Sequence, residues 1–260
     1  MQNDSLLKIF CYGNRTNPPI IFVHGFPFDN SMWSAQVAAL KDSHFVITYD
    51  IRGLGGSPIG DGQFPMHMFA DDLLNILDSL SIKSTAVCGL SMGGYISLAA
   101  FEKEPSRFSK LILCDTRADA DDNAAKSKRA MNIKNINAYG GVRFVQNFLP
   151  LCTSEDFRVN NSDYYNSLLE RYSSVNETSL KACQLAMMGR ADYMHLLGKI
   201  DIPTLVICGE YDSFTPPEFM KNMAAQIKGS EYHTIPNAGH LAPLENPDYT
   251  NNLIIDFLNA

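Results

Sequence analysis

The chain has 260 residues, a formal net charge of -7 and 45% hydrophobic residues, which is enough for one large α/β domain or a domain with an insertion. It has no Lys/Arg run of the kind that binds nucleic acid or an anionic membrane, and no apolar run that approaches a membrane span. The first residues, Met1 to Asp4, lack the basic start and apolar core of a signal peptide.

The cysteine pattern predicts thiols that stay reduced. No two cysteines have CxxC spacing, which argues against a zinc site or a thioredoxin-like site. Together with the N-terminal sequence, this predicts a cytoplasmic protein. We expect no metal or organic cofactor, and a small molecule as the partner; the oligomeric state stays open. The cysteines are Cys11, Cys88, Cys114, Cys152, Cys183 and Cys208.

Short β-branched runs alternate with amphipathic segments along most of the chain. Buried parallel strands are nearly all apolar, and this alternation predicts a mostly parallel sheet with helices on both faces. The segment before Ile20 has room for about one strand. The predicted strands are Leu6–Tyr12, Ile20–Val23, Phe45–Tyr49, Thr85–Cys88, Leu111–Cys114, Thr204–Cys208 and Tyr232–Ile235. The predicted helices between them are Ser31–Leu40, Met68–Leu80, Tyr95–Lys103, Pro217–Ile227 and Pro247–Leu258.

One interval, residues 118–199, has helical patterns and no convincing strand. We therefore expect a core of residues 1–117 and 200–260 with a helical subdomain, 118–199, inserted between two strands. Arg190 and His195 are candidates to bind a substrate carboxylate, although solvated or locally paired roles are favoured. The predicted helices are Asn123–Ile136, Val142–Leu149, Ser162–Tyr172 and Glu177–Met188. The aromatic and Met residues of this interval are predicted to belong to the core rather than to line a pocket. They are Met131, Phe144, Phe148, Tyr164, Tyr165, Tyr172, Met187, Met188, Tyr193 and Met194.

A Gly-x-Ser-x-Gly pattern is centred on Ser91, between the predicted strand Thr85–Cys88 and the helical segment Tyr95–Lys103. A serine on a sharp strand-to-helix turn is pushed out of the sheet, and small residues two positions to either side avoid a clash. The following helix N-terminus favours a developing negative charge. The pattern predicts that Ser91 is a nucleophile.

A serine nucleophile needs a base and an acid that orients the base. His240 follows the last predicted strand, so it lies at the same sheet edge as Ser91. Asp212 follows the preceding strand and is the first candidate for the acid. Glu210 lies closer to the strand end, and Asp115, after the strand Leu111–Cys114, is a rival.

Acyl transfer also needs two donors for the tetrahedral oxyanion. One candidate is the backbone N–H of Met92, directly after the nucleophile. The other is the N–H of Phe26, in the loop after the strand Ile20–Val23; Pro27 has no N–H to offer. For His24, in the same loop, we expect a role in orienting the loop.

These segments together resemble the serial motifs of the α/β-hydrolase fold superfamily, in the superfamily's order and over nearly the whole chain. Its small bacterial carboxylesterases and 3-oxoadipate enol-lactonase-like hydrolases are the most similar members. The resemblance implies Ser91, Asp212 and His240 as catalytic residues, and a cap formed by the insertion. It further implies Phe26 and Met92 as oxyanion donors, with Asp50 and Arg52 shaping a turn. The motifs are His24-Gly25-Phe26-Pro27, Asp50-Ile51-Arg52-Gly53-Leu54-Gly55-Gly56-Ser57, Gly89-Leu90-Ser91-Met92-Gly93-Gly94, Gly209-Glu210-Tyr211-Asp212 and Gly239-His240.

The expected activity is hydrolysis of a small carboxylic ester or lactone through an acyl-enzyme. Haloalkane dehalogenases and epoxide hydrolases resemble the chain but carry aspartate where Ser91 stands. Three alternatives stay open: a ligand-binding protein on a hydrolase scaffold, a C–C bond hydrolase, and a cofactor-free haloperoxidase or perhydrolase.

Overall fold

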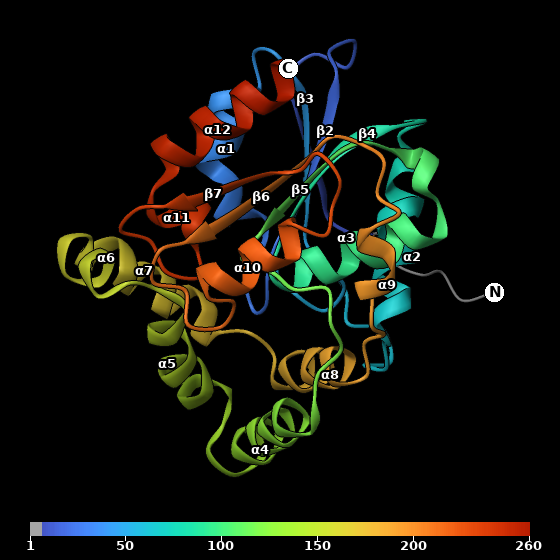
Figure 1. Ribbon diagram of the computed structural model, residues 1–260. Helices are drawn as coiled ribbons and strands as arrows, with labels where there is room; N and C mark the ends of the chain where they lie inside the picture. The colour runs from blue at the N-terminus through green and yellow to red at the C-terminus, as the bar shows by residue number, and fades with distance from the viewer. Residues whose placement is uncertain (1–6) are drawn as a thin grey trace.

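The computed structural model describes residues 7–260, and their strands form a seven-stranded sheet in the order β1-β3-β2-β4-β5-β6-β7. β1 runs antiparallel to β3, and the other neighbours are parallel, as predicted (Figure 1). The strands are β1 (Ile9–Tyr12), β2 (Pro19–Val23), β3 (Phe45–Tyr49), β4 (Thr85–Leu90), β5 (Phe108–Cys114), β6 (Thr204–Gly209) and β7 (Glu231–Ile235).

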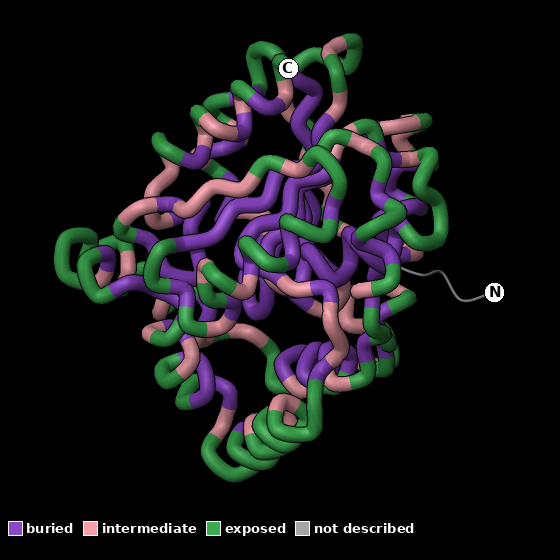
Figure 2. Tube along the Cα trace, viewed as in Figure 1, coloured by how far each residue is buried: buried purple, intermediate pink, exposed green. Residues whose placement is uncertain are grey.

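The burial of the strands follows their place in the sheet (Figure 2). β3, β4 and β6 are buried along their whole length, whereas β7, which pairs only with β6, is buried only at Ile235. Leu6, the predicted start of the first strand, lies outside the described residues. Within those residues β1 begins at Ile9 and is the one strand that precedes β2.

Helices cover both faces of the sheet. α1 packs against α12 on one face, and α2 packs against α3 on the other (Figure 1). In α2 the apolar side chains Phe69, Leu73 and Leu77 recur at helical spacing and are buried, which explains why its amphipathic pattern predicted it. The elements are η1 (Asn30–Trp33), α1 (Ser34–Leu40), α2 (Met66–Ser79), α3 (Met92–Lys103), η2 (Pro105–Arg107), α10 (Pro217–Ala224), α11 (Ala242–Glu245) and α12 (Pro247–Asn259).

Between β5 and β6 the described chain is helical. α4, α5 and α8 lie together beyond one end of the sheet (Figure 1). The side chains of α4 are mostly exposed, and Ile136 is its one buried residue. The helices are α4 (Asn123–Tyr139), α5 (Gly141–Cys152), α6 (Glu155–Asn160), α7 (Ser162–Ser173), α8 (Glu177–Met188) and α9 (Met194–Leu197).

The sequence prediction missed α6, α9 and α11, which have six residues or fewer. Such short helices show too few turns for a recognisable apolar stripe. α6 begins after Ser154, whose hydroxyl accepts from the N–H of Phe157 at 3.1 Å and so caps the helix. Among residues 7–260, no helix is both long and apolar enough to cross a membrane.

Candidate active site

Ser91 occupies a strained turn between β4 and α3. Its backbone has φ 53° and ψ -114°, an uncommon conformation for a residue with a side chain. The turn is tightly packed: a Cβ added to Gly89 would lie 2.5 Å from the Gly93 carbonyl oxygen. A Cβ added to Gly93 would lie 2.1 Å from the carbonyl oxygen of Val23 in β2. Glycine at both positions therefore lets the turn sit directly against the sheet.

The structure brings Ser91, His240 and Asp212 into one chain of hydrogen bonds. Ser91 Oγ lies 2.9 Å from His240 Nε2, and His240 Nδ1 lies 2.8 Å from Asp212 Oδ2. The three residues follow β4, β7 and β6, so the carboxyl ends of parallel strands bring them together. The side chains of Asp212 and His240 are buried, which shields their interaction from water.

The surroundings of Asp212 keep its carboxyl ionised. Burial alone would raise its pKa, but the charge of His240 and several hydrogen bonds outweigh burial and lower the pKa to about 2. Oδ1 accepts from the N–H groups of Phe214 at 2.8 Å and Thr215 at 3.2 Å, and Oδ2 accepts from the Thr215 hydroxyl. An ionised Asp212 holds the proton on His240 Nδ1 and leaves Nε2 free to accept from Ser91.

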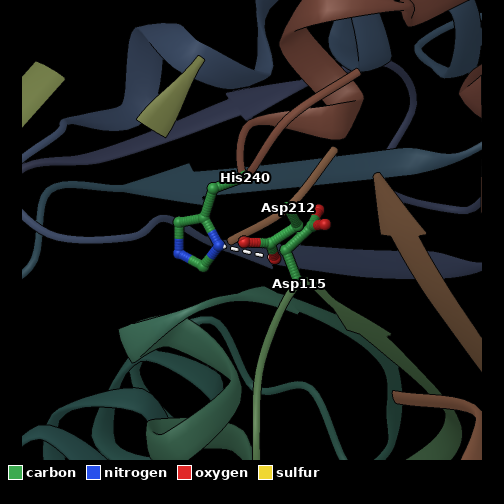
Figure 3. Close-up of side chains that lie close together, drawn as sticks. All are labelled: Asp115, Asp212 and His240. Carbon is green, nitrogen blue, oxygen red and sulfur yellow. Dashed lines mark hydrogen bonds and ion pairs between the residues drawn. The ribbon is translucent and has the colours of Figure 1, made fainter. Parts of the chain in front are cut away.

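The rival acid, Asp115, lies beside Asp212 and has a different bonding pattern (Figure 3). Its Oδ1 accepts from the N–H of Gly209 at 2.7 Å, while its buried Oδ2 has no partner among residues 7–260. Burial, and next the negative charge of Asp212, raise the pKa of Asp115 well above its usual range. Asp115, Asp212 and His240 are also spaced closely enough for a metal ion, but a carboxyl whose pKa is raised holds its proton more tightly and is a poorer metal ligand.

Glu210, the third acid considered, is exposed and accepts from the backbone N–H of Asn237 at 3.0 Å. It therefore steadies the loop that leads to His240 rather than the imidazole itself.

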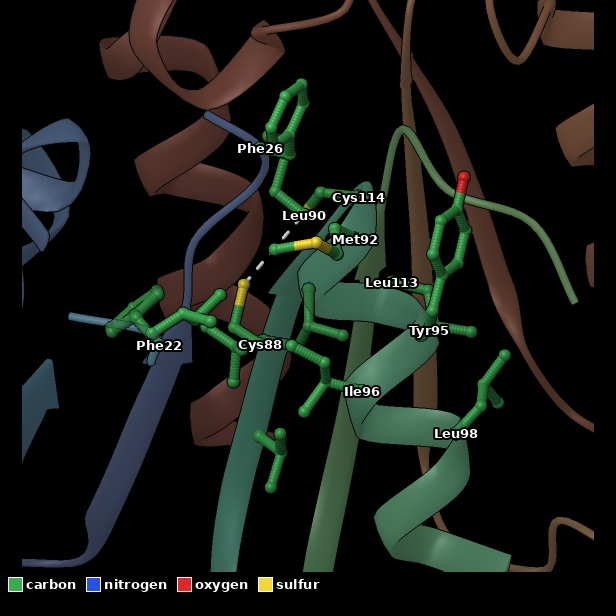
Figure 4. Packing of buried hydrophobic residues seen from close by; sticks show 14 of the residues in the cluster. Phe22, Phe26, Cys88, Leu90, Met92, Tyr95, Ile96, Leu98, Leu113 and Cys114 are labelled. Carbon is green, nitrogen blue, oxygen red and sulfur yellow. Dashed lines mark hydrogen bonds between the residues drawn. The ribbon is translucent and has the colours of Figure 1, made fainter. Parts of the chain in front are cut away.

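Met92 directly follows the serine, and Phe26 lines the same cavity as Ser91. Met92 is the first residue of α3, so its N–H has no acceptor within the helix. A Cβ added to Gly25 would lie 3.4 Å from Ser91 Cβ, so the loop after β2 passes close to the turn. Figure 4 shows Phe26, Leu90 and Met92 packed next to each other. The Met92 N–H at the start of α3 therefore lies next to the serine in the chain, and the loop that contains Phe26 passes close to Ser91.

His24 joins two loops behind the site. Its Nδ1 lies 2.9 Å from the Gly25 carbonyl oxygen, and its Nε2 accepts from the N–H of Ile51 at 2.9 Å. Burial lowers its pKa, so the ring is neutral, as these two bonds require. In the neighbouring turn, Asp50 accepts from the N–H of Gly56 at 2.7 Å, and Arg52 binds Asp72 with two hydrogen bonds.

Ser91 and His240 open into a cavity of about 580 Å³ between the sheet edge and the helical segment. Its wall nearest the serine is aromatic. The Phe148 ring centroid lies 5.6 Å from that of Phe26 and 5.7 Å from that of Phe214, and Phe214 lies 4.9 Å from the His240 ring. Of the aromatic and Met residues noted in the helical segment, those that line the cavity are Phe144, Phe148 and Met187.

The two basic residues considered for a substrate carboxylate do not line this cavity. Arg190 is buried, bonds to Asp121 and stacks over the Tyr95 ring at 4.4 Å. His195 is exposed, and its Nε2 lies 2.9 Å from a Glu102 oxygen. Both are therefore locally paired, as the sequence reasoning favoured.

Comparison with known proteins places the chain in a family. A model of the alpha/beta hydrolase fold matches residues 18–247. A 3-oxoadipate enol-lactonase of Acinetobacter baylyi is 28% identical over 93% of this chain and 89% of its own length. The structure of a thermophilic esterase from Thermogutta terrifontis, with malate bound, is 35% identical and superposes with a TM-score of 0.93 over 97% of this chain and 93% of that one. The enol-lactonase structure from Burkholderia xenovorans is 26% identical, with a TM-score of 0.91 over 98% and 96%. Since the family model spans nearly all of the described chain, this protein belongs to the alpha/beta hydrolase fold family.

Proposed function

We propose that the protein is a serine hydrolase that cleaves a small carboxylic ester or lactone. The observation that carries this proposal is the pair of hydrogen bonds that links Ser91, His240 and Asp212, with the serine facing a cavity. The esterase and enol-lactonase named above act on the same classes of bond and support it.

In the proposed reaction, Ser91 Oγ attacks the ester carbonyl carbon while His240 Nε2 takes the hydroxyl proton. Asp212 stabilises the imidazolium that forms. The tetrahedral intermediate collapses, the bond to the leaving oxygen breaks, and His240 returns its proton to that oxygen. Water then attacks the acyl-enzyme with His240 again as base, and the acid and free Ser91 are released.

The N–H groups of Phe26 and Met92 are proposed to hold the oxyanion in both steps. They lie at the end of β2 and at the first turn of α3, so the sheet fixes them before substrate arrives. Preorganised donors of this kind are worth roughly 3 kcal/mol each in other hydrolases. Residues 118–199 are proposed to act as a cap, because α4, α5 and α8 supply much of the cavity wall.

The test compares two serine variants. Ser91→Ala removes the nucleophile, whereas Ser213→Ala alters another hydroxyl in the same cavity. We expect Ser91→Ala to lower kcat on 4-nitrophenyl acetate by at least about 10⁴-fold and to abolish labelling by a fluorophosphonate. Ser213→Ala should keep both the wild-type kcat and the labelling by the fluorophosphonate. Equal labelling of the Ser91→Ala variant and the wild type would contradict the proposal, as would tight ligand binding without turnover across a panel of esters and lactones.

A further inference from the structure

The loop after β2, residues 24–29, carries Phe26, the proposed oxyanion donor, and contains no strand or helix. β2 fixes the start of this donor loop, and the N–H of Phe28 donates to the Gly25 carbonyl oxygen at 3.0 Å. An oxyanion donor acts only when its N–H points at the position that the oxyanion will occupy. The direction of the Phe26 N–H therefore depends on what holds the end of the donor loop.

Asp29, the last residue of the donor loop, joins it to η1. Asp29 Oδ1 accepts from the N–H of Ser31 at 3.0 Å and from the Ser31 hydroxyl at 2.6 Å, which caps the first turn of η1. On the core side, Asp50 accepts from the N–H of Asn30 at 2.9 Å and from its side-chain amide at 2.7 Å. These two carboxylates hold the end of the donor loop to η1 and to the turn after β3.

A second set of contacts reaches Asp29 from the helical segment. The Nε of Arg171 donates to Asp29 Oδ2 at 2.7 Å, and the Tyr172 hydroxyl lies 3.4 Å from Oδ1. Both residues belong to α7, and the Tyr172 ring packs edge-on against Phe28, with ring centroids 5.0 Å apart. These contacts, the Asp29 link, join two consecutive residues of α7 to the last two residues of the donor loop.

Asp29 meets these partners as an ionised and largely buried carboxylate. Burial alone would raise its pKa, but the hydrogen bonds from Ser31 and Arg171 outweigh burial and lower the pKa. The Asp29 side chain is 8% exposed, so its charge depends on donors that the protein supplies. A hydrogen bond from a guanidinium to a carboxylate is charge-assisted and geometrically specific. The position of Asp29 therefore depends on α7 as well as on η1.

The helical segment also holds the side chain of Phe26. The Phe26 ring centroid lies 6.0 Å from that of Phe144 and 5.6 Å from that of Phe148, both in α5. α5 in turn packs against α7 (Figure 1). The two helices thus contact the donor loop at Phe26 and again at Phe28 and Asp29. The helical segment, together with the sheet, therefore sets the position of the loop.

We propose that Asp29 is a positioning residue for the oxyanion donor, held in place by Arg171 and Tyr172 of α7. The proposal rests on the function proposed above and adds a link through which the helical segment controls the direction of the Phe26 N–H. The described residues that line the cavity facing Ser91 include neither Asp29 nor its two partners in α7. Loss of the Asp29 link should therefore misdirect the donor and slow the reaction, while the surface that binds substrate stays unchanged.

The kinetic test breaks the Asp29 link from each side. In Asp29→Asn the amide oxygen can still accept from Ser31, but the NH₂ that then faces Arg171 cannot accept a hydrogen bond. Arg171→Met removes the donor on α7 and keeps the Asp29 charge. The matched control is Glu102→Gln, which breaks another pair between the core and the helical segment. Glu102 lies near the C-terminal end of α3, and its partner is His195.

The measured quantities are kcat and KM on 4-nitrophenyl acetate. Removal of an oxyanion donor costs about 10²–10³-fold in kcat, so a donor that is misdirected but present should cost about tenfold. We expect this loss in Asp29→Asn and in Arg171→Met. Because the oxyanion forms in acylation and in deacylation, both steps slow together, and KM should change less than about twofold. The double variant should be no slower than either single variant, since both remove the same contact. Glu102→Gln should keep kcat within about twofold of the wild type.

A transition-state analogue distinguishes positioning from a general loss of structure. Butyl trifluoromethyl ketone adds to a nucleophilic serine and presents a tetrahedral oxyanion to the same donors. Its inhibition constant should rise about tenfold in Asp29→Asn and in Arg171→Met, in step with the fall in kcat/KM. The Arg171 side chain is 52% exposed, so the free energy of unfolding of Arg171→Met, measured by chemical denaturation, should stay close to that of the wild type.

Failure of this proposal can be told apart from failure of the hydrolase proposal. Hydrolysis that depends on Ser91 but has the same kcat in both single variants would overturn the Asp29 link alone. Losses that add up in the double variant would overturn it as well, as would a lower kcat with an unchanged inhibition constant. Hydrolysis that persists in Ser91→Ala would refute the proposed function, and the positioning role of Asp29 with it.

Discussion

Replacing Asp212 by asparagine tests how the proposed base is oriented. The two N–H groups of Phe214 and Thr215 face Oδ1, and these groups can only donate. In the variant the amide oxygen must stay on their side, so the amide NH₂ faces His240. The NH₂ then donates to Nδ1, which moves the imidazole proton to Nε2. In that tautomer His240 has no lone pair for the Ser91 hydroxyl.

The expected loss of kcat in Asp212→Asn follows from the free-energy cost of the opposite amide orientation. Turning the amide would leave two buried N–H groups without an acceptor, each worth about 1–3 kcal/mol. The competent tautomer is then disfavoured by roughly 2–6 kcal/mol, which corresponds to a loss between about 30-fold and 10⁴-fold. The variant also loses the negative charge that stabilises the imidazolium, so we expect a fall in kcat near the upper end of this range.

The assay is kcat on 4-nitrophenyl acetate for Asp212→Asn and Asp115→Asn, with ¹⁵N chemical shifts of His240 to identify the tautomer. Asp115→Asn is the matched control, because it changes a buried carboxyl that lies beside Asp212 (Figure 3). It should change kcat by less than about tenfold. The reasoning is refuted if Asp212→Asn keeps a tenth of the wild-type kcat, or if Asp115→Asn proves the more damaging change.

Three further predictions concern the support of the site. Gly93→Ala would push a Cβ into a carbonyl oxygen of β2, so we expect the free energy of unfolding, measured by chemical denaturation, to fall by about 3 kcal/mol or more. Gly198→Ala, in an open position, is the control and should change it by about 0.5 kcal/mol or less. Burial and the charge of Asp212 raise the pKa of Asp115 well above its usual range, whereas in the unfolded chain this carboxyl ionises above about pH 4. The free energy of unfolding therefore falls as pH rises above about 4, and Asp115→Asn should raise Tm over the wild type more at about pH 7 than at about pH 4. In Glu245→Gln the amide NH₂ must face at least one of the backbone N–H groups that the carboxylate now binds, so at least one hydrogen bond is lost. We expect kcat to fall about tenfold in steady-state assays. An unchanged kcat would show that Glu245 does not position the histidine loop.

The sheet and the residues of the candidate site were predictable because short stretches of sequence indicate them. A strand buried on both faces must be apolar, so β3 was predicted at its observed bounds. Residues after parallel strands meet at one edge, which is why Ser91, Asp212 and His240 were singled out before any distance was known. Asp212 was favoured over Asp115 because it lies in the loop after the strand that directly precedes the strand before His240. What distinguishes these two acids physically is their hydrogen-bond donors and their pKa values, which depend on tertiary contacts.

The charged wall of the cavity was not predictable in the same way. α4 lacks a clear apolar stripe, so its sequence does not show which face turns inward. Arg190 and His195 were considered as carboxylate ligands because they are basic residues in the insertion, yet packing pairs them with Asp121 and Glu102. Which basic residues line the cavity therefore depends on the tertiary packing of the helical segment.

Glu245 links the helical segment to the loop that carries the proposed base. One of its oxygens accepts from the N–H groups of Gly239 and Leu241, on either side of His240, at 3.0 and 3.2 Å. The other accepts from the N–H of Ser154, in the turn between α5 and α6, at 2.7 Å. One carboxylate therefore joins the turn between α5 and α6 to the loop that carries His240, so the position of that turn and the position of the imidazole depend on each other. Glu245→Gln should accordingly lower kcat rather than raise KM, because it disturbs the loop that holds the proposed base and leaves the cavity lining unchanged.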